Sequence, residues 1–192
     1  INEEKDHKHD RVIFFLNKKQ KLIYNDVRKF GFIKFLFNKD YKHSFHLKNL
    51  GPEPLTKKFN LCYFKKYITN RNRNIKNLLM DQKFVSGIGN IYANEILFFS
   101  KVRPTRKVKN LKELEIKEIL KFTKFILKKS IKLGGSTIKD FSSSNRKKGS
   151  FQQHFKVYGK KGDLCSNLNC NNKIIRAIIL NRATFYCSKC QK

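Results

Sequence analysis

Four of the five cysteines form two close pairs near the end of the chain. Cys165 and Cys170 have four residues between them, Cys187 and Cys190 have two, and sixteen residues separate the pairs. Each pair can deliver two thiolates to one ion, and this spacing is typical of a tetrahedral four-cysteine zinc site. Disulfides or free thiols are the alternatives, but the sequence has no hydrophobic secretion signal and a reducing compartment disfavours disulfides. We therefore predict one structural zinc ion, which folds this segment and performs no catalysis.

A glycine-rich turn, Gly87-Ile88-Gly89-Asn90, is the second pattern. Glycines let backbone N–H groups converge, and a helix N-terminus adds partial positive charge, so such a turn is suited to bind a phosphate. A tight turn between two helices also needs glycine for steric reasons alone. The pattern by itself leaves both interpretations open.

Two arginines stand where they could reach a nucleic acid. Arg28 and Phe30 are two residues apart and share a face of a strand, so the pair could enter a duplex and replace an extruded base. Arg182 lies at the predicted tip of the hairpin between the cysteine pairs, where it could contact a phosphate. An exposed arginine before a core phenylalanine, and an ordinary turn arginine, are the alternatives. The fifth cysteine, Cys62, is predicted to be a buried small hydrophobe.

Three segments of different secondary structure must position these residues. The first has short apolar runs between polar turns, and its expected strands are residues 12–16, 21–24 and 30–37. Three strands need another layer against their apolar face, so this segment is expected to complete a larger sheet.

Helical periodicity follows a Pro-rich boundary at residues 50–55. The expected helices are one around 75–79, a second at 89–99, and a longer one around the apolar stripe of 116–127 that ends at Gly134-Gly135. The last segment reads as a β-hairpin, with strands 173–180 and 183–186 joined by a turn at 181–182.

The charge balance indicates a polyanionic partner. Lys and Arg number 44 against 14 Asp and Glu, which gives a formal net charge of +30, yet 40% of residues are hydrophobic. A folded basic protein that binds nucleic acid fits best, an anionic membrane surface fits next, and AT bias in the gene accounts for part of the lysine excess. No apolar run is long enough to cross a membrane, so no transmembrane helix is expected. We predict nucleic acid and no membrane as the partner.

Taken in order, the motifs resemble the formamidopyrimidine-DNA glycosylase family over essentially the whole chain. They are Lys8-His9-Asp10, 24–31 with Arg28-Lys29-Phe30-Gly31, 50–55, 79–83, 87–93, 134–137 with Asp140-Phe141, 151–153, 157–159, 182–187 and 190–192. Several motifs in the right order are far more specific than any one of them.

The resemblance implies an α+β fold and three parts. Residues 1–50 would be the remnant of an N-terminal β-sandwich, 51–160 a helix-two-turn-helix domain with a lesion-recognition loop, and 161–192 a zinc finger. It also implies a bacterial, cytoplasmic, nucleoid-associated monomer that binds damaged double-stranded DNA. The family excises oxidised purines, 8-oxoguanine and formamidopyrimidines, and then cuts the strand by β,δ-elimination.

The resemblance also assigns residues. Arg28 and Phe30 match the wedge that fills the void left by the flipped base, and Arg182 matches the hairpin arginine assigned to δ-elimination. The residues at DNA-contact positions are His9, Arg71, Gly87, Gly89 and Asn90. Residues 142–151 take the place of the loop over the flipped base, with Lys147-Lys148-Gly149 where the family usually has Lys-Pro-Gly. The first zinc knuckle has four residues between its cysteines where the family usually has two.

No residue of this sequence matches the family's N-terminal proline nucleophile, its adjacent glutamate or the β-sandwich lysine. We therefore expect the given polypeptide to bind DNA and not to excise bases. Three alternatives stay open: a DNA-binding remnant without chemistry, an endonuclease VIII-type enzyme for oxidised pyrimidines, and a basic zinc-ribbon protein of the ribosome or transcription machinery.

Overall fold

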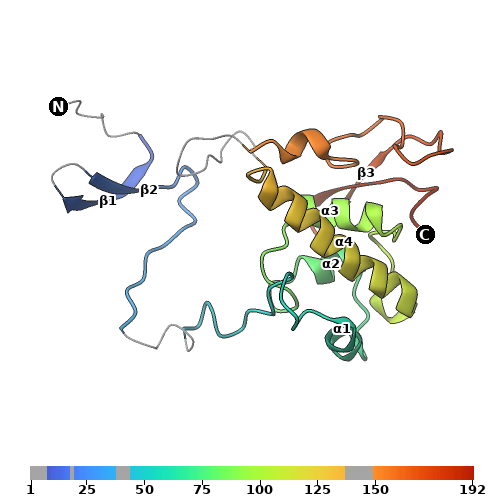
Figure 1. Cartoon of the computed structure of the whole chain (residues 1–192), viewed down its shortest axis with the longest axis horizontal. Helices are drawn as coiled ribbons and strands as arrows, with labels where there is room; N and C mark the ends of the chain where they lie inside the picture. The colour runs from blue at the N-terminus through green and yellow to red at the C-terminus, as the bar shows by residue number, and fades with distance from the viewer. Residues whose placement is uncertain (1–7, 18–19, 38–43, 137–148) are drawn as a thin grey trace. The chain divides into compact units, whose positions relative to one another are not determined.

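The computed structural model describes residues 8–17, 20–37, 44–136 and 149–192. Its contacts divide the chain into two compact units, residues 1–41 and residues 42–192, and each unit is described by itself (Figure 1). The predicted mixed fold, with strands followed by helices and a final hairpin, is confirmed.

Unit 1 is a β-hairpin followed by an extended segment. Strand β1 (Asp10–Asn17) pairs antiparallel with β2 (Gln20–Asn25), with Ile13 opposite Ile23. The third strand predicted at residues 30–37 is wrong, because no residue of that segment is in a strand. Phe30 is 77% exposed and Phe37 83% exposed, so the aromatic pattern has no partner strand and no apolar layer within the described residues to hold it.

All four α-helices of the described residues lie in unit 2. They are α1 (Leu61–Ile68), α2 (Ile75–Leu79), α3 (Asn90–Phe99) and α4 (Glu113–Lys132), with short 3-10 turns at Val108–Asn110 and Phe151–His154. The Asn60 side chain accepts the Tyr63 N–H at 3.0 Å and caps α1, while Glu115 accepts the Lys112 N–H at 2.7 Å and caps α4. Gly134 and Gly135 end α4 at positive φ, as the sequence predicts.

The helices enclose one hydrophobic core. The predicted stripe of α4 is buried, and it packs with α1, α2 and α3 around Phe59, Phe64 and Phe84. A smaller cluster joins α3 to the hairpin through Phe98, Val157, Ile174, Phe185 and buried cysteines. Phe99 and Tyr158 pack against both clusters, so the hairpin is attached to the helices by continuous apolar packing.

The stretch predicted as a boundary is packed against the turns between α2 and α3. The Gly51 N–H donates to the Gln82 carbonyl at 2.8 Å, and the Ser86 N–H donates to the Pro52 carbonyl at 3.2 Å. A Cβ at position 51 would lie 2.4 Å from the Phe84 carbonyl oxygen, so only glycine permits this approach.

The C-terminal hairpin consists of β3 (Ile175–Ile179) and β4 (Arg182–Tyr186), paired antiparallel. Its two-residue turn is Leu180-Asn181, with φ of 46° and 54°, which is the geometry of a primed hairpin turn. The predicted turn at 181–182 is therefore one residue too late. Arg182 is the first residue of β4 and pairs with Ile179.

The predicted lesion-recognition loop, including Lys147 and Lys148, falls largely in residues 137–148, which lie outside the described part of the chain. Its downstream end is fixed, because the Ser150 N–H donates to the Leu133 carbonyl at 3.0 Å and the Phe151 N–H donates to the Gly135 carbonyl at 3.1 Å.

Within the described residues no helix has both the length and the apolar character needed to cross a bilayer.

Candidate nucleic-acid interface and metal centre

The four paired cysteines meet at one point. The Cys165 and Cys190 sulfurs are 3.8 Å apart, those of Cys170 and Cys187 are 3.7 Å apart, and all four lie within 4.8 Å of one another. A tetrahedral zinc with Zn–S bonds of about 2.3 Å requires sulfurs about 3.8 Å apart, whereas a disulfide requires about 2.05 Å. The predicted cluster is therefore present, and its geometry fits a metal and not two disulfides.

Backbone N–H groups already face these sulfurs. The Asn172 N–H lowers the pKa of the Cys170 thiol to about 7, whereas burial raises the pKa of Cys165. Hydrogen bonds from backbone N–H groups stabilise a thiolate, which is the form that binds a metal. The donor set and its surroundings thus suit a closed structural site, and a cation would offset the cost of burying these sulfurs as thiolates.

The turns between α2 and α3 present an open helix N-terminus. The Gln82 side chain accepts the Gly87 N–H at 2.7 Å and donates to the Ile88 carbonyl at 3.1 Å, which fixes the second turn. Gly87 has φ +83°, and Gly89 is the N-cap of α3 without a side-chain cap. Both glycines are exposed, with nothing within 4 Å of where a Cβ would stand, so an anion can approach the backbone N–H groups.

A row of hydrogen bonds fastens β4 to the two helices. The Ala183 carbonyl accepts from the Asn90 side-chain amide at 3.0 Å and from Lys76 Nζ at 3.2 Å. The Lys76 ammonium also donates to Thr184 Oγ1 at 2.6 Å, and Asn94 Oδ1 accepts the Phe185 N–H at 2.7 Å. The turn residue Asn90 and the strand that begins with Arg182 are thereby held in a fixed relation.

Sequence reasoning missed Lys76. Its side chain is 1% exposed, and burial together with the nearby charge of Arg182 lowers the pKa of the lysine to about 8. The one sequence signal was a lysine next to Ile75 in a short apolar helix. In a chain so rich in lysine, that signal does not separate a buried ammonium from a solvated one.

A groove of about 380 Å³ lies between the turns and the hairpin tip. Its lining comes from α2, the following turn and the hairpin: Arg73, Asn77, Met80, Asp81, Gln82, Ile179, Leu180 and Arg182. Arg73 forms an ion pair with Asp81 at 2.5 Å, and Arg182, the first residue of β4, lines the same groove. Arg182 thus lies in a groove beside the glycine-rich turn. Arg73 is a second arginine in this groove, and the sequence analysis did not predict it.

Arg71 lies elsewhere in unit 2. Its guanidinium stacks 4.3 Å from the Tyr67 ring centroid, and its Nε donates to the Tyr67 carbonyl at 2.6 Å, just beyond the end of α1. It does not line the groove that contains Arg182, and its predicted phosphate contact stays a prediction.

In unit 1, Asp26 shapes the turn that presents Arg28 and Phe30. One carboxylate oxygen accepts the N–H groups of Arg28 at 3.0 Å and Lys29 at 2.9 Å, and the other accepts the Gly31 N–H at 2.8 Å. These bonds, the Gly31 one foremost, lower the pKa of Asp26. The Arg28 guanidinium lies 4.7 Å from the Phe30 ring centroid, so the two form one exposed cation–aromatic pair.

His9 precedes β1 in the same unit. Its backbone carbonyl accepts the Asp26 N–H at 3.0 Å, while its buried Nδ1 has no hydrogen-bond partner among the described residues. Because this nitrogen is buried, it is not itself open to a phosphate, and the predicted DNA contact of His9 stays a prediction.

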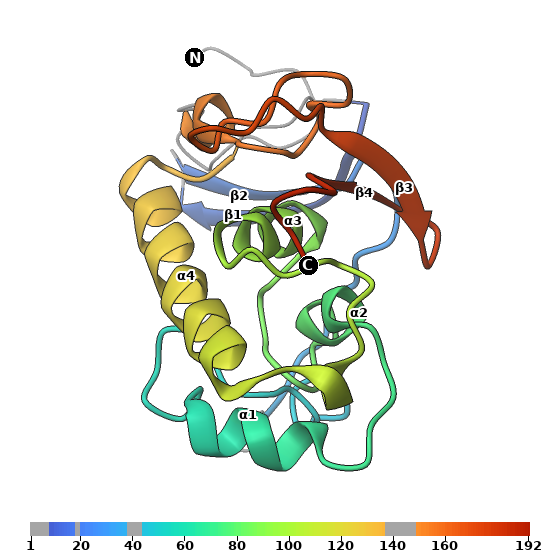
Figure 2. The same cartoon turned by 90° about the vertical axis from the view of Figure 1, so that its right-hand side faces the viewer.

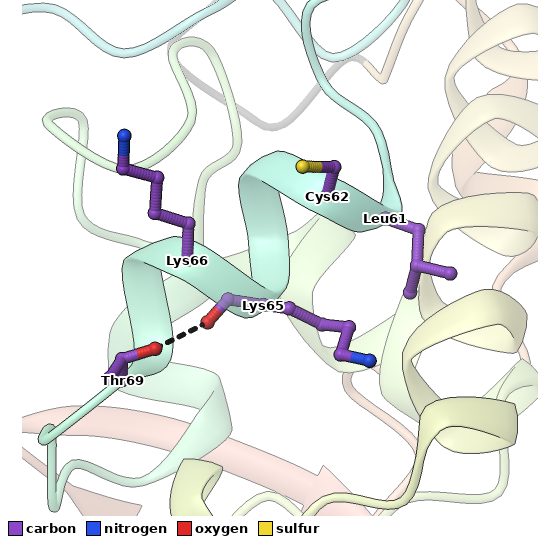
Figure 3. A pocket seen from close by; sticks show the side chains of 5 residues that line it. All are labelled: Leu61, Cys62, Lys65, Lys66 and Thr69. Carbon is purple, nitrogen blue, oxygen red and sulfur yellow. Dashed lines mark hydrogen bonds between the residues drawn. The ribbon is translucent and has the colours of Figure 1, made fainter.

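Cys62 corrects another expectation, because its side chain is exposed. It lies on α1 in a shallow groove lined by Leu61, Lys65, Lys66 and Thr69 (Figure 3). The side chain points away from the helix axis toward solvent, so the core of this region is formed by Phe64 and not by the cysteine.

Helices α2 and α3 are joined by two turns, and the four-cysteine hairpin is hydrogen-bonded to α3. This combination is the helix-two-turn-helix and zinc-hairpin class of DNA-binding protein. Residues 50–142 match the formamidopyrimidine-DNA glycosylase H2TH domain. A formamidopyrimidine-DNA glycosylase of Rickettsia bellii is 43% identical over 185 residues, which cover 96% of this chain and 67% of the relative. The protein of Rickettsia felis is 41% identical over 184 residues, covering 96% and 66%.

Solved structures agree with these relatives. The MutM (Fpg) protein of Thermus thermophilus superposes with a TM-score of 0.89 at 32% identity, covering 97% of this chain and 70% of that one. A Lactococcus lactis Fpg variant in complex with Fapy-dG-containing DNA gives a TM-score of 0.91 at 34% identity, covering 100% and 69%. The chain belongs to the formamidopyrimidine-DNA glycosylase family, and it spans about two thirds of the length of these relatives.

Proposed function

We propose that this chain forms the DNA-binding part of a glycosylase that removes oxidised purines from double-stranded DNA. One observation carries the proposal: Arg182 and the open N-terminus of α3 are held together by the hydrogen bonds of Lys76, Asn90 and Asn94 to β4. Two sources of positive charge in a fixed relation suit the phosphates that flank a single nucleotide. The relatives solved with Fapy-dG, abasic and carbocyclic 8-oxo-G DNA support this choice of substrate class.

We assign roles accordingly. Gly87, Gly89 and Asn90 bind a phosphate at the α3 N-terminus, and Arg182 binds one at the hairpin and acts in strand elimination. Arg28 and Phe30 fill the void left by the flipped base, since a ring with a guanidinium beside it can stack and hydrogen-bond in the vacated space. His9 and Arg71 complete the phosphate contacts.

The chemistry of excision needs an amine nucleophile, and we propose that these 192 residues bind lesions without forming a covalent bond. Lys76 has the lowered pKa that such an amine needs, but its Nζ is buried and donates to two oxygens of β4, so it cannot reach a sugar carbon. AP lyase activity therefore belongs to a polypeptide that carries the family's N-terminal proline.

We further propose that the ion bound by the four cysteines is zinc. The parts of the protein are proposed to be residues 1–50, 51–160 and 161–192. The monomeric state and the cytoplasmic, nucleoid-associated location stay predictions.

The test compares Arg182→Ala with Arg176→Ala on duplexes that carry an abasic site. Arg176 lies on β3 of the same hairpin and is exposed, so it matches the change in charge and in residue type. We expect Arg182→Ala to weaken abasic-site binding about tenfold or more, and Arg176→Ala to change it little, because a lost charge-assisted hydrogen bond costs about 1.5–3 kcal/mol. Equal effects in fluorescence anisotropy would contradict the assignment of Arg182.

Borohydride trapping on 8-oxoguanine and oxidised-pyrimidine duplexes tests the chemistry. The given chain should trap neither substrate, and a form extended to the family's N-terminal proline should trap the purine lesion. Trapping of the pyrimidine lesion alone would support the endonuclease VIII-type alternative, and trapping by the given chain would refute the proposed absence of a nucleophile.

A further inference from the structure

The C-terminal half of α4 carries lysines without interspersed acidic residues. Residues 119–136 contain five lysines and no aspartate or glutamate. Of these lysines, only Lys121 has a carboxylate partner among the described residues, Glu118 at 3.2 Å. Lys128, Lys129 and Lys132 are exposed, and no ion pair of the described residues includes them.

Three phenylalanine rings lie under and among these lysines. The Phe99 ring centroid is 5.5 Å from that of Phe122 and 6.1 Å from that of Phe125, and the centroids of Phe122 and Phe125 are 6.2 Å apart. Phe122 and Phe99 are partly buried against the core, whereas Phe125 is 49% exposed. The Lys121 ammonium stands 5.0 Å from the Phe122 ring centroid. A rigid aromatic cluster thus presents one half-exposed ring within a basic surface.

The spacing arranges these groups along one line. Lys121, Phe125, Lys128 and Lys132 follow one another at intervals of four, three and four residues, which places them on one stripe of the helix. With a rise of about 1.5 Å per residue, the stripe is about 16 Å long. We call these four residues the α4 stripe.

The α4 stripe is separate from the groove that contains Arg182. Helix α3 packs against α4 and also against β4, and Figure 2 shows α3 between the two. A ligand bound in the hairpin groove therefore leaves the outward face of α4 uncovered.

We propose that the α4 stripe is a second nucleic-acid contact and that it binds a single-stranded segment. Lysines at this spacing attract the phosphates of a strand, and an exposed ring among them offers a surface on which an unpaired base stacks. A duplex satisfies the lysines equally well but has no free base face for Phe125, because its bases are already stacked on one another. The half-exposed ring therefore favours a single strand over a duplex.

The experiment measures binding of a fluorescent oligothymidylate to the full chain, with the hairpin groove first saturated with an abasic-site duplex. We expect Phe125→Ala to weaken oligothymidylate binding about fivefold or more, and Phe125→Tyr to retain it, because stacking of one base on an aromatic ring contributes about 1–3 kcal/mol. Lys128→Glu/Lys132→Glu should weaken it further. Neither change should alter the affinity for the abasic-site duplex.

The matched control is Lys57→Glu/Lys58→Glu, which makes the same change in net charge at exposed residues ahead of α1. It should have a much smaller effect than the change on α4. Equal effects of the two double substitutions would overturn the proposal, because binding would then follow total charge alone.

Two other outcomes would also overturn it. One is displacement of the oligothymidylate by the abasic-site duplex, which would place the single strand in the hairpin groove. The other is an undamaged duplex that binds the saturated protein with the same dependence on Phe125. In a photocrosslinking experiment, a 5-iodouracil oligonucleotide should become attached to the peptide that contains Phe125. Attachment only to peptides of the hairpin would contradict the proposal.

Discussion

At the scale of single residues, Lys76 shows how a buried charge can organise a binding site. Its ammonium donates to the Ala183 carbonyl and the Thr184 hydroxyl, and these contacts compensate in part for the loss of water. The remaining penalty, together with the charge of Arg182, is expressed as the lowered pKa of about 8. The lysine thus connects α2 to the strand that begins with Arg182.

We predict that Lys76→Met changes the free energy of unfolding little at pH 7, because the lost hydrogen bond to Thr184 Oγ1, worth about 1–3 kcal/mol, is offset by removal of the penalty for burying the ammonium. Urea denaturation followed by circular dichroism measures this. The folded pKa is below the unfolded value of 10.5, so the unfolded state holds more protons between pH 8 and 10.5. The stability of the wild type relative to Lys76→Met should therefore rise with pH across that window, and a constant difference would contradict the burial of a charged amine.

Glu95 provides a second prediction. Its carboxylate accepts the N–H groups of Lys156 at 2.8 Å, Val157 at 3.0 Å and Tyr158 at 2.9 Å, and burial raises its pKa in spite of these bonds. Glu95→Gln should lower the unfolding free energy by roughly 1–3 kcal/mol, because an amide has one acceptor oxygen where the carboxylate has two. Glu118→Gln, which removes an exposed charge on α4, should cost under about 1 kcal/mol.

The pH dependence of that difference has a definite sign. A carboxyl whose folded pKa is above 4.5 takes up its proton first in the folded state. The wild type should therefore gain stability relative to Glu95→Gln as the pH falls from the raised pKa toward 4.5. A gain in the opposite direction would show that the three N–H bonds outweigh burial.

At the scale of elements, the sequence predicts what local patterns control. The buried apolar face of α4 and the cysteine pairs are visible in the sequence, because helical periodicity and ligand spacing are short-range features. Residues 30–37 failed as a strand because a strand depends on a partner, which the sequence of the segment does not encode. The hairpin turn was misplaced by one residue because leucine rarely adopts positive φ, as Leu180 does here. Lys76 was missed because its partners are more than a hundred residues away.

Removal of the metal tests the hairpin as an element. We predict that chelation abolishes binding to abasic-site DNA while most of the helical circular dichroism remains. The main core of α1 to α4 contains none of the four cysteines, whereas the smaller cluster contains Cys165, Cys170 and Cys187. Addition of zinc should restore binding. Retained DNA affinity in metal-free protein would refute the structural role of the metal.

At the scale of the whole molecule, the net charge of +30 governs association with DNA. Part of this charge lies at the groove beside the hairpin and part on α4, and the two parts act on any phosphate backbone. Under the proposed function, charge supplies affinity for DNA, and the fixed relation of Arg182 to the α3 N-terminus would set the position of the lesion.

We predict a steep salt dependence for undamaged duplex binding. If six to ten phosphates are contacted, the affinity should fall by about a thousandfold or more between 50 and 200 mM salt. Arg182→Ala should reduce the slope of log affinity against log salt by about one, since it removes one phosphate contact. Anisotropy titrations over a salt series measure both quantities, and an unchanged slope in the variant would mean that Arg182 contacts no phosphate.

The close approach of Gly51 to the Phe84 carbonyl has an evolutionary consequence. The Pro-rich stretch at residues 50–55 is where an insertion, a deletion or an exchange of the preceding segment would be expected to do least harm. Here the tolerance for such changes ends before Leu50, because Gly51 and Pro52 are already bonded to the turns that carry the glycine-rich motif. Recombination one or two residues too late would change more than a connector, because it would misalign the motif that we propose binds a phosphate.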